Sequence, residues 1–398
     1  MKRSILLLIV IVSLATTANA QWVKTNGPDS SGIVSSIVIN GTKIFAGTFG
    51  EGAFLSTDGV NWGSIDNGLS DSSLYSLAYN NSTLIAGTSH SGIFVSTNNG
   101  TSWTPSNTGL PATFIYTLIV NNGIVYAGTD QGMFISANNG ANWTAANAGA
   151  LYDVYAIAIK DSNIFEGTYA NQIYRSTNNG ASWTSAGNGL PNASINAMVI
   201  IDSNIFAGTN GLGVYRSTNN GAMWLLKSNG LPTGAFIWTF AVSGHYIFAG
   251  TLGNGVYISS NYGENWVPVN TGLNGSDLAI YSLAIFDNTI YAGTYNGYVW
   301  KRSLSEIITS GIDETIINKE IGIYPNPAKE NLTIVNKSTT NQSYTVTLRT
   351  IQGQQVLSKD IKLVNTYSMD VTNIANGIYI LTLQNESTQI VEKVIVQH

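Results

Sequence analysis

The chain has 398 residues, 44% of them hydrophobic, which is enough for a large buried core and a second, smaller domain. Charged residues make up only 10%, and the formal net charge is −5, so there is no basic stripe of the kind that binds nucleic acid. The chain contains no cysteine, which excludes a disulfide framework and leaves burial and sheet closure to stabilise the fold.

Residues 1–20 are predicted to be a secretory signal peptide. A basic start, Lys2-Arg3, precedes an apolar run over residues 5–12 and a small-x-small cleavage site, Ala18-Asn19-Ala20. The apolar run is too short to span a bilayer, so cleavage is favoured over the alternative, an N-terminal membrane anchor. We expect the mature chain to begin at Gln21 and to have no transmembrane segment.

A sequence repeat of about 40 residues then recurs through most of the chain, and this period is typical of propeller blades built from four strands. Its Gly-Thr strand and its tryptophan each return after 39 to 43 residues. The glycines are Gly47, Gly87, Gly128, Gly167, Gly208, Gly250 and Gly293, and the tryptophans are Trp22, Trp62, Trp103, Trp143, Trp183, Trp224 and Trp266.

The unit at residues 72–110 shows how one repeat is built. We expect strands at 76–79, 84–88, 93–96 and 102–104, separated by turns rich in Asn, Ser and Gly. Asn98-Asn99-Gly100 supplies a tight turn because these residues tolerate positive φ. No stretch has a convincing 3.6-residue period, so the repeats are predicted to be all-β.

The turn Ser-x-(Asn/Asp)-x-Gly-x-x-Trp resembles the Asp-box, or BNR repeat, of sialidases, sortilin and xyloglucanases. It recurs at 96–103, 136–143, 176–183, 217–224 and 259–266, and in a form one residue shorter at 56–62. Only Asp58 keeps the aspartate; asparagine replaces it elsewhere, so a role that needs charge is doubtful. In the resembled families this turn lies on the face opposite the ligand site, which implies a purely structural role here.

The two ends of the repeat region complement each other. Trp22 begins a fourth strand without three strands before it, whereas the unit around Gly293 has no tryptophan strand after it. A ring closed by the N-terminal strand satisfies both and leaves no open edge. We therefore predict a seven-bladed β-propeller over residues 21–304; the alternative, an open β-solenoid, leaves both ends unpaired.

A linker is predicted at residues 305–320, followed by a β-rich domain at 321–398. Tyr324-Pro325-Asn326-Pro327, the Gln352-Gly353 turn, the phrase at 375–379 and the terminal run at 393–396 resemble the type A C-terminal sorting domain of the Bacteroidetes type IX secretion system. The resemblance implies an immunoglobulin-like β-sandwich recognised by that machinery after Sec export. It also implies cleavage near the linker and a product that is secreted or attached to the cell surface. An accessory sandwich with a binding role is the alternative.

The propeller loops between second and third strands, and those entering each first strand, should share one face. Aromatic rings beside amides and carboxylates on that face suit a sugar ligand. The candidate binding residues are Phe49, His90, Phe114, Tyr152, Tyr169, Phe236, Trp238 and Tyr295. Packing between blades is the alternative role for each ring, Trp238 especially.

Catalytic candidates are sparse. A glycosidase needs two carboxylates flanking one bond, and Asp71, Asp153 and Asp277 are the weak candidates near this face, with no spacing that singles out a pair. Arg175, Arg216 and Arg302 occupy equivalent third-strand positions beside the Asp-box turn, and they lack the Arg-Ile-Pro sequence of sialidases. They are therefore not assigned as a carboxylate-binding triad.

Other chemistry is not indicated by the sequence. Glu166, which replaces the alanine of the Ala-Gly-Thr phrase, is expected either to line the central channel or to face water. The three histidines have no metal-ligand spacing, and no metal or cofactor is expected.

Two classes of function remain after this reading. The favoured one is a non-catalytic, surface-displayed binding or adhesion propeller for a glycan or protein. The alternative is a secreted glycoside hydrolase, which the short, regular loops disfavour.

Overall fold

The computed structural model describes residues 21–29, 32–111, 114–146, 152–169, 173–310, 321–325, 327–336, 342–350, 354–385 and 389–398. The predicted signal peptide, residues 1–20, lies outside these ranges, as do Asn326, Gln352-Gly353 and residues 311–320 of the predicted linker. The chain divides into two compact units, residues 1–312 and 313–398. Within the described ranges, no helix is long and apolar enough to cross a membrane.

The described residues of the first unit form seven four-stranded antiparallel sheets, numbered here in chain order. Sheet 1 contains β2 (Ile33–Asn40), β3 (Lys43–Phe49), β4 (Gly52–Ser56) and β5 (Gly63–Ser64). Sheet 2 contains β6 (Leu74–Asn80), β7 (Thr83–Thr88), β8 (Ile93–Ser96) and β9 (Thr104–Pro105). Sheet 3 contains β10 (Ile115–Asn121), β11 (Ile124–Thr129), β12 (Gly132–Ser136) and β13 (Thr144–Ala145). Sheet 4 contains β14 (Val154–Lys160), β15 (Asn163–Thr168), β16 (Ile173–Ser176) and β17 (Thr184–Ser185). Sheet 5 contains β18 (Ile195–Ile201), β19 (Asn204–Thr209), β20 (Val214–Ser217) and β21 (Leu225–Leu226). Sheet 6 contains β22 (Ile237–Ser243), β23 (Tyr246–Thr251), β24 (Gly255–Ser259) and β25 (Val267–Pro268). Sheet 7 combines β26 (Ile280–Phe286), β27 (Thr289–Thr294) and β28 (Tyr298–Ser303) with β1 (Val23–Pro28), and a short 3-10 turn, η1 (Gly275–Leu278), precedes it.

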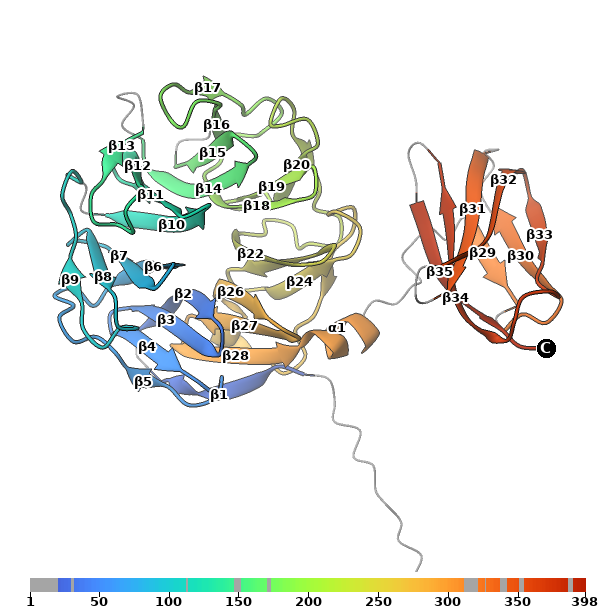
Figure 1. Ribbon diagram of the computed structural model, residues 1–398, viewed down its shortest axis with the longest axis horizontal. Coiled ribbons are helices and arrows are strands. Elements are labelled where there is room, and N and C mark those ends of the chain that lie inside the picture. Colours follow the sequence, from blue (N-terminus) through green and yellow to red (C-terminus); the bar gives the residue numbers. More distant parts are fainter. Residues whose placement is uncertain are drawn as a thin grey trace, which may run out of the picture. The chain divides into compact units, whose positions relative to one another are not determined.

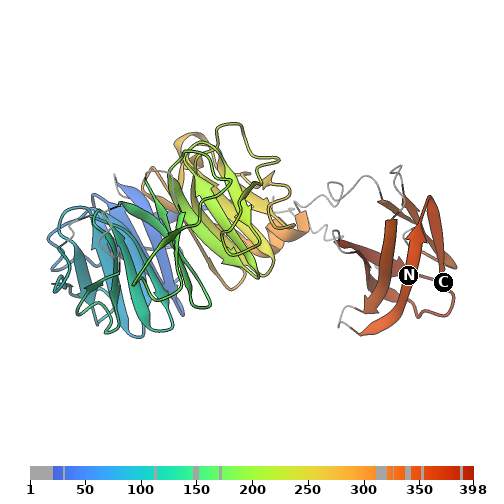
Figure 2. The same cartoon turned by 90° about the horizontal axis from the view of Figure 1, so that it is seen from above.

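The sheets stand around a common centre with the first strand of each nearest to it (Figure 1). Figure 2 shows the propeller from its edge, after a 90° turn. Neighbouring first strands lie against one another around the ring, and β26 lies against β2. The core is divided accordingly: apolar clusters form between successive sheets, as where Phe165 of β15 and Ile205 of β19 pack together. The prediction of an all-β propeller domain is confirmed.

The tryptophan of each repeat joins its sheet to the preceding one. The indole nitrogen of Trp103 donates to the carbonyl of Ile65 at 2.6 Å, and the backbone N–H of Trp103 donates to Asn67 at 2.9 Å. The indoles of Trp143, Trp183, Trp224 and Trp266 donate to the equivalent carbonyls at 2.6–3.0 Å. Each of these side chains buries apolar area and satisfies its polar group in one contact.

Glycine allows this close approach. Gly109 of the Asn-x-Gly-Leu phrase has φ +81°, and a Cβ there would sit 2.1 Å from the carbonyl oxygen of Trp143. Any larger residue would have to displace the backbone of the next sheet, so the glycine and the tryptophan of successive repeats are required together.

The N-terminal strand takes the same position in sheet 7. β1 pairs antiparallel with β28, and Trp22, 1% exposed, donates its indole N–H to Val269 at 2.6 Å and its backbone N–H to Thr271 at 2.8 Å. On its other side, Thr25 accepts a hydrogen bond from the indole of Trp62 at 3.1 Å. The strand therefore contacts sheets 6 and 1 as well as completing its own sheet.

The Ser-x-Asn-x-Gly turns are closed by side-chain hydrogen bonds. In the turn after β12, Ser136 accepts from the backbone N–H of Gly140 at 2.9 Å, and Asn138 accepts from that of Asn142 at 2.9 Å. In the first turn the carboxylate of Asp58 accepts from Asn61 and Val60, and these bonds hold its pKa well below the ordinary value. Asparagine thus closes the turn without the charge.

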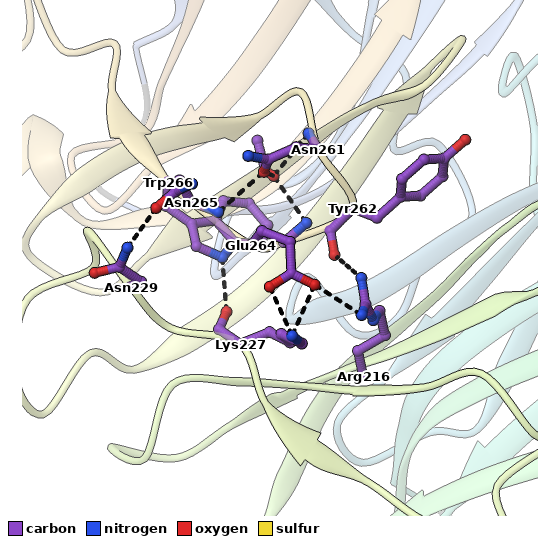
Figure 3. A network of polar contacts seen from close by, with 10 residues as sticks. Arg216, Lys227, Asn229, Asn261, Tyr262, Glu264, Asn265 and Trp266 are labelled. Carbon is purple, nitrogen blue, oxygen red and sulfur yellow. Dashed lines mark hydrogen bonds and ion pairs between the residues drawn. The ribbon is translucent and has the colours of Figure 1, made fainter. Parts of the chain in front are cut away.

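One ionic cluster joins sheets 5 and 6 at this end of the ring (Figure 3). Glu264 accepts from Arg216 at 2.8 Å and from Lys227 at 2.6 Å, and Arg216 also donates to the carbonyl of Tyr262. Glu264 is substantially exposed, so the cluster contributes mainly orientation rather than large stability.

The predicted linker starts later than expected. Residues from 304 form helix α1 (Leu304–Ser310), in which Leu304 and Ile307 are fully buried in the apolar cluster of sheets 6 and 7. Its apolar residues, Leu304, Ile307 and Ile308, have the spacing of a helix, but about two turns are too short for that spacing to be distinguished from a linker in the sequence.

The second unit is built from two sheets. One contains β29 (Ile321–Tyr324), β30 (Asn331–Asn336) and β33 (Thr366–Asp370), and the other contains β32 (Gln355–Leu363), β31 (Gln342–Thr350), β34 (Gly377–Gln384) and β35 (Gln389–Val396). Side chains from both sheets, including Leu332, Met369, Val346 and Leu381, form one core.

Replacing Trp22 by alanine should lower the free energy of unfolding by about 3–5 kcal/mol, because it removes a fully buried indole and its hydrogen bond. The exposed neighbour provides the control: Val23→Ala should change stability by less than about 0.5 kcal/mol. Both variants would be measured by urea unfolding. If Trp22→Ala unfolds at the same urea concentration as the wild type, β1 does not close the ring.

Candidate functional site

Two sets of loops meet at one end of the propeller. In a four-stranded antiparallel meander, the turn between the second and third strands lies at the same end as the entry to the first strand. The structure shows this directly: the N–H of Asp130, after β11, donates to the carbonyl of Phe114, before β10, and Tyr169 donates likewise to Asp153. This end, opposite the Ser-x-Asn-x-Gly turns, is called the mouth below.

Every first strand carries a β-bulge at the mouth. In each, the pairing with the second strand shifts by one residue, leaving one extra residue between two paired ones. The extra residues, called the bulge ring, are Ser35, Tyr75, Tyr116, Tyr155, Asn196, Trp238 and Tyr281. All seven are half-buried, and a bulge of this kind re-aims its side chain out of the regular alternation of the strand.

Tyrosines of the bulge ring form a continuous row of ring contacts with loop aromatics. The central contacts join Tyr75 to Phe114 at 4.8 Å, Phe114 to Tyr116 at 4.6 Å and Tyr116 to Tyr155 at 4.4 Å between ring centroids. Phe49 extends the row at one end and Tyr169 at the other. These six residues, from sheets 1 to 4, are called the first wall.

A second, smaller group lies on sheets 6 and 7. Trp238 contacts Tyr281 at 5.5 Å in an edge-to-face arrangement, and Tyr281 contacts Tyr295 at 6.3 Å. These three residues are called the second wall. Burial raises the pKa of Tyr281, and the phenols of Tyr295 and Tyr75 raise it further, so Tyr281 lies within electrostatic range of both walls.

The predicted binding residues fall into three groups. Phe49, Phe114 and Tyr169 belong to the first wall, with the ring of His90 6.4 Å from that of Phe114. Trp238 and Tyr295 belong to the second wall, so the ring of Trp238 faces other rings at the mouth. Tyr152 instead stacks on Tyr174 of β16, with 5.3 Å between the ring centroids. Phe236, the residue directly before β22, is 42% exposed.

Six members of the bulge ring are absent from the residues predicted from the sequence: Ser35, Tyr75, Tyr116, Tyr155, Asn196 and Tyr281. A signal for them exists, because each is the residue after the first buried residue of a first strand, at the same place in every repeat. In a regular strand this side chain would follow the alternation of its neighbours. The bulge changes its direction, so the sequence pattern does not place it at the mouth.

The three catalytic candidates have different surroundings. Asp71 accepts from the backbone N–H groups of Ser73 and His90, each at 2.9 Å, and therefore closes a turn. Asp277 is within 3.3 Å of the indole nitrogen of Trp300 and the amide nitrogen of Asn296. Within the described ranges, no hydrogen bond joins any two of the three carboxylates.

Asp153 lies beside Tyr116 of the first wall. Burial raises the pKa of its carboxyl, and the nearby charge of Asp130 raises it further, while the hydroxyl of Tyr116, 3.4 Å away, opposes the shift. Burial, followed by the charge of Asp153, also raises the pKa of Tyr116 well above the ordinary value. The phenol of Tyr116 therefore stays protonated and remains a hydrogen-bond donor.

The arginines are held in structural contacts away from the mouth. Arg175 donates to the carbonyl of Asn220 at 3.1 Å, Arg216 binds Tyr262 and Glu264, and Arg302 donates to Val269 at 2.9 Å. The structure therefore does not assemble them into an anion-binding triad. No group of three or more His, Cys, Asp or Glu residues able to hold a metal ion occurs in the described part of the chain.

Glu166 neither lines the channel nor faces water. Its side chain is 3% exposed on β15, beside Ile157 of β14 and Tyr174 of β16, and its Oε2 has no hydrogen-bond partner among the described residues. Burial raises the pKa of the carboxyl to about 8. The equivalent residue is alanine in the other sheets: Ala46, Ala86, Ala127, Ala207, Ala249 and Ala292.

Two protein-family models each match part of the chain. Residues 322–397 match the secretion system C-terminal sorting domain, a family of the type IX system. The second unit is a type IX sorting domain. This sorting domain directs the chain through the secretion machinery to the cell surface or the medium. Residues 96–212 match the DUF6242 beta propeller domain. No curated protein sequence matches the chain.

Solved structures with the same fold are distant in sequence. The extracellular domain of BT4673 from B. thetaiotaomicron is 16% identical with a TM-score of 0.60, over 94% of this chain and 48% of that one. PorZ, a surface component of the type IX secretion system of Porphyromonas gingivalis, is 13% identical with a TM-score of 0.56, over 94% and 60%. YCF48 bound to D1 peptide is 13% identical with a TM-score of 0.56, over 72% and 97%. At these identities the likeness shows the fold alone.

The buried Glu166 should make stability depend on pH. The pKa of its carboxyl is about 8 in the folded chain against an ordinary 4.5, so its protonated form is retained on folding. Its contribution is therefore fully present below about pH 4.5 and is lost as the pH rises towards 8, by roughly 3–5 kcal/mol.

Glu166→Gln should remove this slope, because the amide does not titrate. The free energy of unfolding would be measured for wild type and variant at about pH 5 and about pH 8.5, with the stability difference growing at the higher pH. Glu166→Ala, which restores the residue of the other six sheets, serves as a second variant. Parallel pH profiles in all three proteins would contradict the assignment.

Proposed function

We propose that the protein is a seven-bladed, Asp-box propeller displayed outside the cell, which binds a neutral glycan at its mouth. The seven sheets and the repeated Ser-x-Asn-x-Gly turns support the blade count and the Asp-box assignment. The two-sheet C-terminal unit, proposed here to be immunoglobulin-like, carries the propeller through the type IX system. Cleavage near residues 311–320 would then release the propeller or transfer it to a surface anchor.

The bulge ring is the observation that carries this proposal. Its members are one serine, one asparagine, one tryptophan and four tyrosines, so every side chain is uncharged and carries a hydrogen-bonding group. Sugars present apolar C–H faces ringed by hydroxyl groups. Aromatic rings can cover those faces while phenol, indole and amide groups bind the hydroxyls.

Exposure at the mouth supports a ligand of some size. Phe49, Tyr169 and Tyr295 are 39%, 59% and 52% exposed, so the outer ends of both walls are open to solvent. Large aromatic side chains gathered and exposed on one face mark an interaction surface. A peptide is the competing ligand, since YCF48 with the same fold binds the D1 peptide, but the uncharged ring favours a neutral polyhydroxylated ligand.

A glycoside hydrolase is the second candidate, and one observation favours it. A carboxyl group with a raised pKa beside a second carboxylate is the arrangement of a general acid, and Asp153 with Asp130 fits that description. Tyr116, which bonds to Asp153, lies in the first wall where a sugar would stack. The binding function is preferred because the loop that carries Asp130 is short: β11 ends at Thr129 and β12 begins at Gly132.

The test uses the chain from Gln21 to His398 on immobilised β-1,3-glucan, xyloglucan, mannan, starch and xylan. We expect retention on at least one of them, and Tyr116→Ala should weaken that retention about tenfold because the ring joins the two halves of the first wall. Leu225→Ala, on the outer strand of sheet 5 and 59% exposed, is the control and should bind like the wild type.

The same samples decide between binding and hydrolysis. New reducing ends that disappear in Asp153→Asn, with retention unchanged, would establish the hydrolase. Retention without new reducing ends supports the binding protein. No retention on any polysaccharide, together with capture by an extracellular peptide library, would replace the glycan with a peptide ligand.

A further inference from the structure

Charge is distributed unevenly between the two ends of the propeller. The mouth is formed by the segments between second and third strands and by those entering each first strand. Seven acidic residues stand in these segments: Asp29, Glu51, Asp66, Asp71, Asp130, Asp153 and Asp277. Of the lysines and arginines in residues 21–312, Lys227 alone stands in one of them, and its ammonium bonds to Glu264 at the opposite end. The mouth therefore has a negative field that no lysine or arginine of its own balances.

The other bases of the propeller are used in structural contacts. Lys160 and Arg175 both bond to Asn220, which lies in a Ser-x-Asn-x-Gly turn at the end opposite the mouth. Lys24 places its ammonium 3.1 Å from the ring centroid of Tyr298, on the outer strands of sheet 7. Positive charge is thus held at the far end and on the outside of the ring.

Two of the mouth carboxylates contact the first wall. Asp130 accepts a hydrogen bond from the backbone N–H of Phe114 at 3.4 Å, and Asp153 accepts one from the phenol of Tyr116 at 3.4 Å. The rings of Phe114 and Tyr116 lie 4.6 Å apart between centroids. Burial, and with it the charge of Asp130, raises the pKa of Asp153, so the two carboxyl groups lie within electrostatic range of each other. Both acids are therefore beside the same pair of rings.

Neither of these two carboxylates is balanced by a cation. In the part of the chain that the structure describes, no ion pair joins a lysine, arginine or histidine to Asp130 or Asp153. The neighbouring stretches of sequence at 112–113, 147–151 and 170–172 contain no basic residue either. Two half-buried carboxylates without a counter-charge repel a further negative group and attract a positive one.

We infer that Asp130 and Asp153 make the mouth select glycans by the sign of their charge: acidic sugars are excluded, neutral sugars bind, and amino sugars bind more tightly. This rests on the glycan-binding function proposed above. It adds two specificity-determining residues that lie outside the bulge ring.

The selection follows from where a bound sugar would lie. A sugar stacked on Phe114 or Tyr116 has its substituents close to both carboxylates, and charges interact over a Debye length of roughly 8 Å at physiological salt. A carboxylate or sulfate on that sugar is a like charge, which lowers affinity without any steric clash. A protonated amino group is an opposite charge and also interacts favourably with the faces of the rings.

Derivatives of one polysaccharide test the selection. The chain from Gln21 to His398 would be titrated with hydroxyethyl, carboxymethyl and 2-aminoethyl ethers, at matched low substitution, of the polysaccharide that it retains from the panel above. The substituents are similar in size and are neutral, negative and positive at about pH 7. The carboxymethyl form should bind at least about tenfold more weakly than the hydroxyethyl form, and the aminoethyl form at least about threefold more tightly. Both differences should shrink in about 1 M salt, where the Debye length is about 3 Å.

Removing the two charges is the second test. Asp130→Asn combined with Asp153→Asn keeps hydrogen-bond acceptors at both positions and removes their charge. The ratio of hydroxyethyl to carboxymethyl affinity should fall at least about fivefold, and this ratio cancels any general change in affinity. Each single variant should lower the ratio by a smaller factor, so the result does not depend on the folding of the double variant.

The matched control removes two charges at the opposite end. Asp161 and Asp202 stand in the turns between first and second strands of sheets 4 and 5, with φ +55° and +52°, a conformation that asparagine also adopts. Asp161→Asn combined with Asp202→Asn changes the net charge by the same amount as the mouth variant and should keep the wild-type ratio.

The outcomes separate this inference from the proposed function. Equal affinity of the wild type for the hydroxyethyl and carboxymethyl forms would overturn the selection by charge while leaving glycan binding intact. So would a ratio that the mouth variants leave unchanged, or one that the control lowers as much as they do. An absence of binding to every polysaccharide and derivative would remove the proposed function and, with it, this inference.

Discussion

The structure depends on a hydrogen-bonded contact that each repeat makes with the one before it. A tryptophan places its indole in the preceding inter-sheet core and donates both of its N–H groups to carbonyls of that sheet, as Trp103 does to Ile65 and Asn67. A glycine at positive φ admits the tryptophan's own backbone. Because a sheet of four short strands cannot bury both faces alone, this pairwise contact sets the rotation between neighbours and hence the closing of the ring.

Most of the fold could be predicted because its signal is repeated. Seven copies of one sequence repeat identify strands and turns far better than any single copy. Trp22 has no preceding strands of its own repeat, which predicted that its strand, β1, pairs with the last repeat, as it does with β28. Helix α1 was missed because the helical spacing of Leu304, Ile307 and Ile308 extends over only about two turns. The burial of Glu166 was also not predicted, since a charged residue in a strand suggests water unless its neighbours are known to cover it.

The mouth was predicted in outline and not in its centre. Loop aromatics such as Phe49, Tyr169 and Tyr295 could be placed by topology alone, because alternate turns of a meander share an end. Tyr116 and Tyr155 could not, because a bulge is a property of strand pairing that one strand's sequence does not reveal. The same limit applies to the surroundings of the carboxylates: Asp71, Asp153 and Asp277 look alike in sequence, and only the structure shows which groups each of them contacts.

The closure of sheet 7 has a consequence for the order of events during export. β1 is the first strand of the ring to be synthesised, yet its partner β28 lies more than 270 residues later, with Thr25 bonded to Val299 across a separation of 274 residues. Until that strand emerges the ring has an unpaired edge at each end, and contacts so distant in sequence form slowly. The propeller therefore cannot complete itself on a partly translocated chain, which favours passage through the inner membrane in an unfolded state and assembly beyond it.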